Sequence, residues 1–85
     1  MLTTAKIGEH PGKVLARDFF EPRHLTIYRV ARETGIDRRA IGGVLTGKKP
    51  LPLREAVLLA RYFGQEEDFF AQLQLRHDLC SCREQ

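Results

Sequence analysis

Two pairs of basic residues carry the chemistry that is easiest to read in this sequence. Arg38 and Arg39 are adjacent and follow Asp37, and Lys48 and Lys49 are adjacent a short distance further on. A guanidinium group forms paired hydrogen bonds with the edge of guanine, and a lysine ammonium group binds phosphate oxygens. The two pairs therefore predict a nucleic-acid contact.

The distribution of charge supports the same prediction. The chain has 85 residues with 14 Lys and Arg, 11 Asp and Glu, and a net charge of +3. Between Arg23 and Arg54 there are eight basic and two acidic residues, a local balance of +6, whereas the remainder has a balance of −3. Positive potential concentrated on one stretch of a mildly acidic chain is typical of a nucleic-acid-binding surface.

Two short amphipathic helices are needed to position these basic residues. Thr26 is suited to the N-cap of the first helix and Asp37 to that of the second, while Gly35 is suited to end the first. Both segments show helical spacing: Ile27, Val30, Ala31 and Thr34 follow it in the first, and the apolar residues Ala40, Ile41, Val44 and Leu45 follow it in the second, up to Gly47. A helix, a short turn with glycine and a second helix, in this order, are the layout of a helix-turn-helix motif.

This layout predicts which residues face DNA. The side of the second helix opposite its apolar stripe would read bases in the major groove, and it carries Arg38, Arg39, Gly42, Gly43 and Thr46. Residues at helix ends and in the following loop would contact phosphates, namely Thr26, Arg29, Lys48, Lys49 and Arg54. The adjacent glycines either reflect packing or allow close approach to the DNA backbone.

The rest of the chain predicts three further helices and an all-α fold. His10 is read as the entry residue of a helix that ends at Pro22, and apolar spacing resumes from Leu53 to Phe63 and again from Phe69. We expect one domain over residues 1–85, with a core at about 10–79, flexible tails at both ends and fraying from Leu79 onward.

Several function classes are excluded by the residues present. Cys80 and Cys82 would close only a tiny disulfide loop, and together with His77 they offer three metal ligands where structural zinc needs four. The remaining alternatives for Cys80 and Cys82 are a reactive thiol and a thiol that pairs with another subunit. His10 and His24 have no accompanying nucleophile or acid, so we predict no enzymatic activity, no metal and no cofactor.

The sequence also carries expectations about compartment and assembly. No apolar run approaches the length of a membrane span and the first residues lack a secretory signal, so we expect a cytoplasmic protein without a membrane partner. The aromatic residues near the fourth and fifth helices are most simply core. Apolar residues nevertheless occur on more than one side of these helices, which predicts a homodimer interface formed by Leu59, Tyr62, Phe70, Leu75 and Leu79.

From His10 to Leu79 the sequence resembles the HigA/VapI branch of the XRE (Cro/repressor-like) helix-turn-helix proteins. The matching segments are His10-Pro11-Gly12 with Leu15, Phe19-Phe20-Glu21-Pro22, Leu25-Thr26 with Tyr28-Arg29 and Ala31, Gly35-Ile36, Ile41 with Thr46-Gly47-Lys48, Ala56 with Leu59-Ala60-Arg61-Tyr62-Phe63-Gly64, and Phe69-Phe70 with Leu73-Gln74. The resemblance implies a five-helix, lambda-repressor-like dimer that binds an inverted-repeat operator in its own promoter. It also implies an antitoxin that restrains a partner toxin, usually a HigB-like mRNA-cleaving ribonuclease.

Three residues of the helix-turn-helix depart from the pattern of this family. Ile27 replaces the usual Gln that helps to hold a phosphate, and Gly42-Gly43 replace larger polar residues of the recognition helix. Base reading from the middle of that helix is therefore curtailed. Two alternatives to the antitoxin follow, namely a protein-interaction module with the helix-turn-helix as scaffold, and a solitary transcriptional regulator.

Overall fold

The computed structural model describes residues 8–83, and this range contains helices without strands. In chain order they are α1 (Pro11–Val14), which continues directly into the π-helix η1 (Leu15–Phe20), α2 (Ile27–Thr34), α3 (Arg38–Leu45), α4 (Leu53–Tyr62) and α5 (Phe69–Arg83). With α1 and η1 counted as one helix, the predicted all-α fold of five helices is confirmed. The predicted N-terminal tail includes residues 1–7, which lie outside the described residues.

The first helix widens after one turn. Its N-cap His10 accepts a hydrogen bond at Nδ1 from the backbone nitrogen of Gly12, at 2.9 Å, as expected of a helix-entry residue. The backbone nitrogen of Glu21 donates to the carbonyl of Ala16, five residues back, at 3.0 Å. This wider turn, which was not predicted, accompanies the burial of Phe19 and Phe20 in the core.

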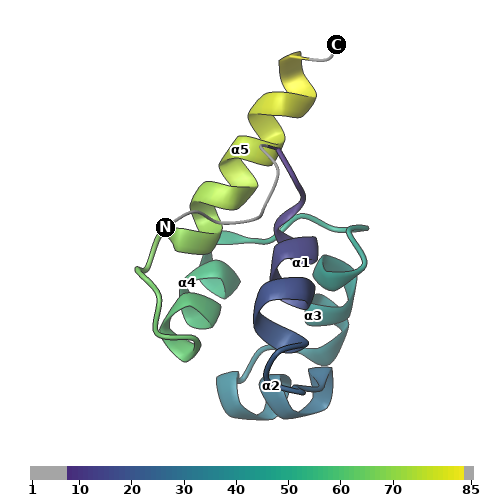
Figure 1. Ribbon diagram of the computed structural model, residues 1–85, viewed down its shortest axis with the longest axis vertical. Helices are drawn as coiled ribbons and strands as arrows, with labels where there is room; N and C mark the ends of the chain where they lie inside the picture. Colours follow the sequence, from purple (N-terminus) through teal and green to yellow (C-terminus); the bar gives the residue numbers. More distant parts are fainter. Residues whose placement is uncertain (1–7, 84–85) are drawn as a thin grey trace.

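The helices α1, α2 and α3 form one side of the molecule, with α2 crossing beneath the other two (Figure 1). A Cβ atom added to Gly12 would lie 1.7 Å from the carbonyl oxygen of Val44, so only glycine allows α1 to approach the end of α3 this closely. Between α2 and α3, the side chains of Val30, Ile36 and Ile41 are buried.

The helix α4 lies on the other side of the core and contributes Ala56, Leu59 and Ala60 to it. Leu53 was placed in this apolar stripe from its spacing, but that assignment is wrong. It is the first residue of α4 and its side chain is 69% exposed. Leu51, in the preceding loop, is buried instead.

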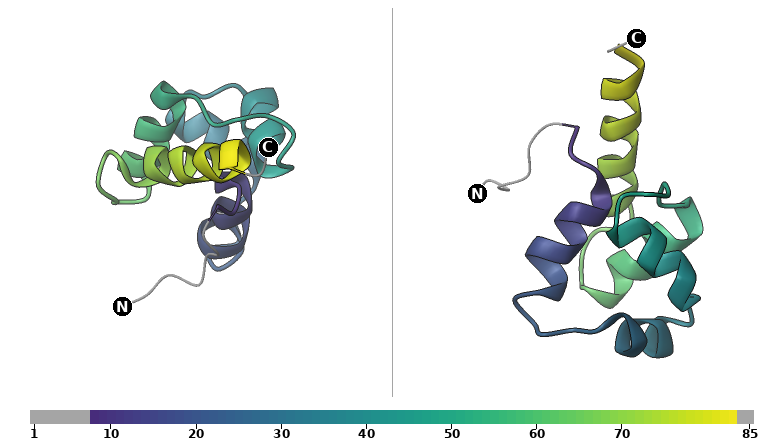
Figure 2. Two further views of the ribbon diagram at one scale, coloured as in Figure 1. Left: turned by 90° about the horizontal axis from the view of Figure 1, so that it is seen from above. Right: turned by 90° about the vertical axis from the view of Figure 1, so that its right-hand side faces the viewer.

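The helix α5 begins against the core and then extends away from the other helices (Figures 1 and 2). Phe70, near its start, is fully buried. The residues from Leu79, where fraying is expected, continue the helix to Arg83. The chain before α1 packs on this helix, and the carbonyl oxygen of Gly8 lies 2.8 Å from Nδ1 of His77. Within residues 8–83, no helix is long and apolar enough to cross a membrane.

Candidate nucleic-acid interface

The α2–turn–α3 unit has the caps that the sequence predicts. Thr26 caps α2, its hydroxyl oxygen accepting a hydrogen bond from the backbone nitrogen of Arg29 at 3.1 Å. Gly35 ends α2 with a φ of 81°, the left-handed conformation that glycine adopts without strain. Asp37 occupies the N-cap position of α3, but its side chain makes no capping hydrogen bond.

The predicted base-reading residues lie together on α3, on the side away from buried Ile41 and Val44. Arg38 and Arg39 occupy the exposed first turn, and neither pairs with a carboxylate within residues 8–83. The hydroxyl of Thr46 is exposed but donates back to α3, with oxygen distances of 3.0 and 3.1 Å to the carbonyls of Gly42 and Gly43. The two guanidinium groups are therefore the available donors of this face.

The two glycines of α3 have different surroundings. A Cβ atom at Gly42 would meet only the Cδ1 of Ile27, at 4.0 Å. At Gly43 it would lie 2.9 Å from Cδ and 3.4 Å from Cβ of Lys49, because the aliphatic part of that side chain covers this glycine. Packing thus explains Gly43, whereas nothing in the structure explains Gly42.

The predicted phosphate-binding residues fall into two groups. Lys48 and Lys49 are exposed and form no ion pair among the described residues. In contrast, Arg29 pairs with Glu33 at 3.3 Å and Arg54 pairs with its neighbour Glu55 at 3.1 Å. Exposed ion pairs are weak, so they leave these arginines able to exchange partners.

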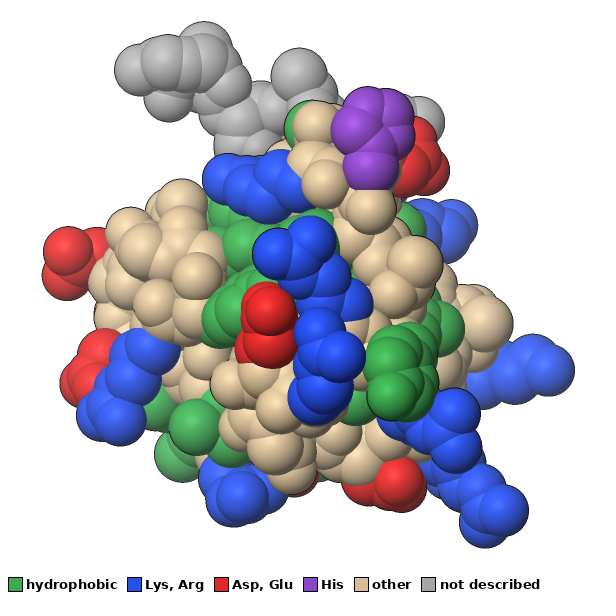
Figure 3. All heavy atoms as spheres, turned by 90° about the horizontal axis from the view of Figure 1, so that it is seen from below, with side chains coloured by type: hydrophobic (Ala, Val, Ile, Leu, Met, Phe, Trp, Pro, Cys, Tyr) green, Lys and Arg blue, Asp and Glu red, His purple; other side chains and the backbone are tan. Residues whose placement is uncertain are grey.

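The hydroxyl oxygen of Thr26 accepts the capping bond, which leaves its hydrogen free to donate. In Figure 3, viewed from the end that carries α2, lysine and arginine side chains project along the edge on which α3 lies in Figure 1. Basic side chains therefore project from this edge of the molecule.

A side-chain hydrogen bond joins α2 to α4. The phenol of Tyr62 donates to the carboxylate of Glu33, which lowers the pKa of Glu33 and raises the pKa of Tyr62. The ion pair with Arg29 lowers the pKa of Glu33 further. Sequence reasoning missed this contact because the two residues are far apart in the chain and neither belongs to a motif.

The predicted dimer interface is wrong in part. Leu59 and Phe70 are 2% and 0% exposed within the single chain, so they have no surface left for a partner. Tyr62 is half-buried and bonded to Glu33. Leu75 and Leu79 are 50% and 44% exposed on α5 and are the members of the set that can meet another molecule.

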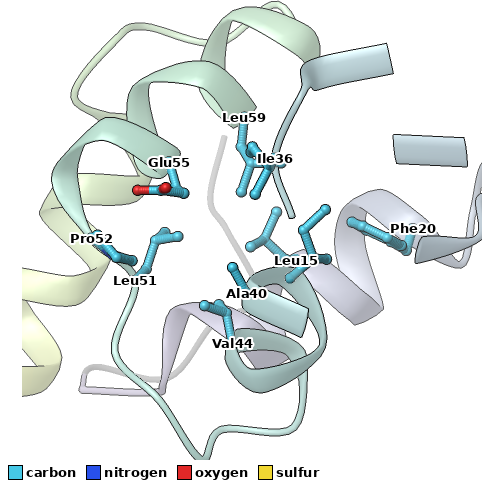
Figure 4. Close-up of a pocket in the computed structure, with 10 residues that line it drawn as sticks. Leu15, Phe20, Ile36, Ala40, Val44, Leu51, Pro52, Glu55 and Leu59 are labelled. Atoms are coloured by element: carbon cyan, nitrogen blue, oxygen red, sulfur yellow. The ribbon is translucent and has the colours of Figure 1, made fainter. Parts of the chain in front are cut away.

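The described residues offer no metal site, and the apolar cavity in the core is too small for a ligand. Among residues 8–83, no group of three His, Cys, Asp or Glu side chains is arranged to hold a metal ion. The apolar cavity in Figure 4, lined by residues such as Leu15, Ala40 and Leu51, encloses about 10 Å³. That volume holds at most one water molecule and excludes an organic ligand.

Comparisons with known proteins agree with this geometry. The helix-turn-helix family matches residues 17–70. The chain is 24% identical over 70 residues to virulence-associated protein I of Dichelobacter nodosus, covering 82% of this chain and 65% of that protein. It is 31% identical over 68 residues to an uncharacterized helix-turn-helix transcriptional regulator of Haemophilus influenzae, covering 80% of this chain and 64% of that protein. It thus spans just under two thirds of the length of these curated relatives.

The fold is also similar to a solved antitoxin. The structure of Pseudomonas aeruginosa antitoxin HigA with the higBA promoter superposes with a TM-score of 0.84 and 21% sequence identity. The match covers 88% of this chain and 82% of that one. At this level of identity the likeness shows the fold.

Proposed function

Because this chain belongs to the helix-turn-helix family, we propose that it binds operator DNA sequence-specifically and represses its own operon as the antitoxin of a type II toxin–antitoxin module. The family consists of DNA-binding domains and not of enzymes, in agreement with the expectation that the chain is no enzyme. We place it in the cytoplasm, as a homodimer on an inverted-repeat operator.

One observation carries the DNA-binding part of this proposal. Arg38 and Arg39 stand exposed in the first turn of α3 without a carboxylate partner among residues 8–83, and Lys48 and Lys49 lie in the loop that follows the same helix. Guanidinium groups at the start of a recognition helix can reach guanine O6 and N7, while lysines in the next loop reach the backbone. The fold shared with a promoter-bound antitoxin supports the same use of this face.

The antitoxin part of the proposal rests on the relatives. The HigA antitoxin shares the fold, and virulence-associated protein I shares sequence over most of this chain. We infer a HigB-like ribonuclease as the partner toxin.

Co-expression with each adjacent reading frame tests the antitoxin assignment. We expect one neighbour to stop growth when expressed alone, to become harmless with this chain and to co-purify with it. Purified protein should also protect an inverted repeat in the promoter of its own operon. If no neighbour is toxic but the promoter is bound, the chain is a solitary regulator.

A second candidate function is a protein-interaction module that uses the helix-turn-helix as a scaffold. Gly42 and Gly43 favour it, because they offer no side chain to bases in the middle of α3. Neutralisation of a toxic neighbour by protein that binds neither its own promoter nor random duplex would support this function over operator binding.

A further inference from the structure

We propose that Gln74 of α5, together with His10, positions the loop that carries Lys48 and Lys49 and thereby sets how firmly the protein holds DNA phosphates. The inference rests on the proposed DNA binding and extends it to two residues outside the helix-turn-helix motif. Both residues hydrogen-bond to the backbone of the loop, so each acts through it.

The loop leaves α3 in a defined direction. The backbone nitrogens of Lys48 and Lys49 both donate to the carbonyl of Gly43, at 3.1 Å each, and Gly47 adopts a φ of 77°. These contacts fix the first half of the loop to the end of α3.

Gln74 holds the second half of the loop. Its side-chain oxygen accepts a hydrogen bond from the backbone nitrogen of buried Leu51 at 2.8 Å. Its side-chain nitrogen donates to the carboxylate of Asp78 at 2.9 Å, which turns the amide so that the oxygen faces the loop. A backbone donor in a partly buried position would otherwise lack a partner, so this bond specifies the path of the chain after Lys49.

His10 holds the same loop from α1. Its Nδ1 accepts from the backbone nitrogen of Gly12, so the proton of the neutral ring is on Nε2. Nε2 therefore donates to the carbonyl oxygen of Lys49, at 3.0 Å. The ring of His77, on α5, packs edge-on against that of His10 with centroids 4.9 Å apart.

Lys49 is thus fixed on both sides while its side chain runs along Gly43 toward the DNA-facing side of α3. A phosphate contact made by a fixed lysine loses less conformational entropy than one made from a loose loop. Removal of the Gln74 bond should therefore weaken the phosphate contacts without touching the basic groups.

Replacement of Gln74 by methionine removes the acceptor and keeps the size of the side chain. The matched control is Gln72→Met, two residues earlier on α5, where the side chain is exposed and makes no hydrogen bond among the described residues. Binding to operator and scrambled duplexes would be titrated over a range of salt concentrations, at a temperature at which all variants are folded.

We expect Gln74→Met to weaken binding to both duplexes about three- to tenfold at low salt and to reduce the log–log salt slope by about 0.9, the value for one phosphate contact. Gln72→Met should leave both quantities unchanged. Hydrogen exchange at the Leu51 amide should accelerate in Gln74→Met and slow again in Gln74→Glu, which keeps an acceptor.

A salt slope equal to that of the natural protein in folded Gln74→Met would overturn the inference, because a purely structural role changes stability and not the slope. If the methionine variant does not fold, Gln74→Asn gives the same test, since its amide is one methylene too short to reach Leu51. Failure of the natural protein to bind either duplex would instead reject the proposed function itself.

Discussion

Arg38 and Arg39 differ from Lys48 and Lys49 in what they are able to recognise on DNA. If the arginines reach base edges, Arg38→Ala or Arg39→Ala should weaken operator binding by about 1 to 3 kcal/mol and affect random DNA much less. Lys48→Ala or Lys49→Ala should weaken both duplexes about equally and reduce the log–log salt slope by about 0.9 per contact. Titrations on operator and scrambled duplexes at several salt concentrations measure the difference.

The same titrations show how the assignment can fail. Equal losses on both duplexes for the arginine variants would make Arg38 and Arg39 merely electrostatic, with base reading done elsewhere. If none of the four substitutions matters, the protein-interaction module becomes the better account of the fold.

His10 makes the stability of the folded chain depend on pH. Burial lowers the pKa of His10 below its ordinary value near 6.5, and the nearby charge of His77 lowers it further. The unfolded chain therefore gains this proton at a higher pH than the folded chain does. Stability should be complete above pH 6.5 and should fall as the pH drops through that value toward the lowered pKa.

Replacement of His10 by asparagine tests the predicted loss of stability at low pH. Asparagine is a good N-cap and does not titrate, so His10→Asn should flatten the dependence of unfolding free energy on pH between about 7 and 5. The control is His24→Asn, because His24 is exposed with a φ of 53°, a conformation that asparagine tolerates. Urea unfolding at several pH values is the measurement, and an unchanged profile in His10→Asn would contradict the assignment.

At the scale of elements, the two glycines of α3 provide a matched pair. Gly42→Ala should stabilise the protein by about 0.5 to 1 kcal/mol, because alanine favours the helix and the added methyl group meets nothing closer than 4.0 Å. Gly43→Ala should give a smaller gain or a loss, because the side chain of Lys49 must move. Thermal or urea unfolding of both variants compares them, and equal gains would show that Lys49 does not pack on Gly43.

The elements that local signals control could be predicted from the sequence. Thr26 and Gly35 mark the ends of α2 because capping depends on neighbouring residues alone, and the apolar spacing of α3 gives its buried side. The π-turn of η1 and the full length of α5 depend on contacts between distant segments, such as Gly8 with His77. No pattern within either segment reports such contacts.

In the candidate site, too, local signals could be predicted from the sequence and contacts between distant residues could not. The sequence predicts that Arg38, Arg39, Lys48 and Lys49 share one DNA-binding surface, because they lie within or next to a recognisable motif. The bond from Gln74 to Leu51 joins residues 23 positions apart, and neither has a side chain that is unusual for a helix or a loop. Residues that position the site therefore became visible only in three dimensions.

At the scale of the whole molecule, an apolar helical face can be buried within one chain or between two. The spacing of apolar residues in the sequence identifies such a face but does not determine which residues cover it. Leu59 and Phe70 are covered by their own chain, whereas Leu75 and Leu79, four residues apart on α5, are not. Residues four apart lie on one side of a helix, so these leucines form a continuous exposed strip.

This strip predicts where two copies meet. A single helix-turn-helix makes few contacts, and a two-fold dimer doubles them on an inverted repeat with half-sites about 10 base pairs apart. Leu75→Glu and Leu79→Glu should therefore convert the dimer to a monomer in sedimentation and weaken operator binding, because a buried unpaired carboxylate opposes association. Leu53→Glu, at the similarly exposed leucine that starts α4, serves as the control. If only Leu53→Glu dissociates the dimer, the interface lies at the start of α4 and not on α5. A natural protein that sediments as a monomer with and without DNA would rule out the dimer.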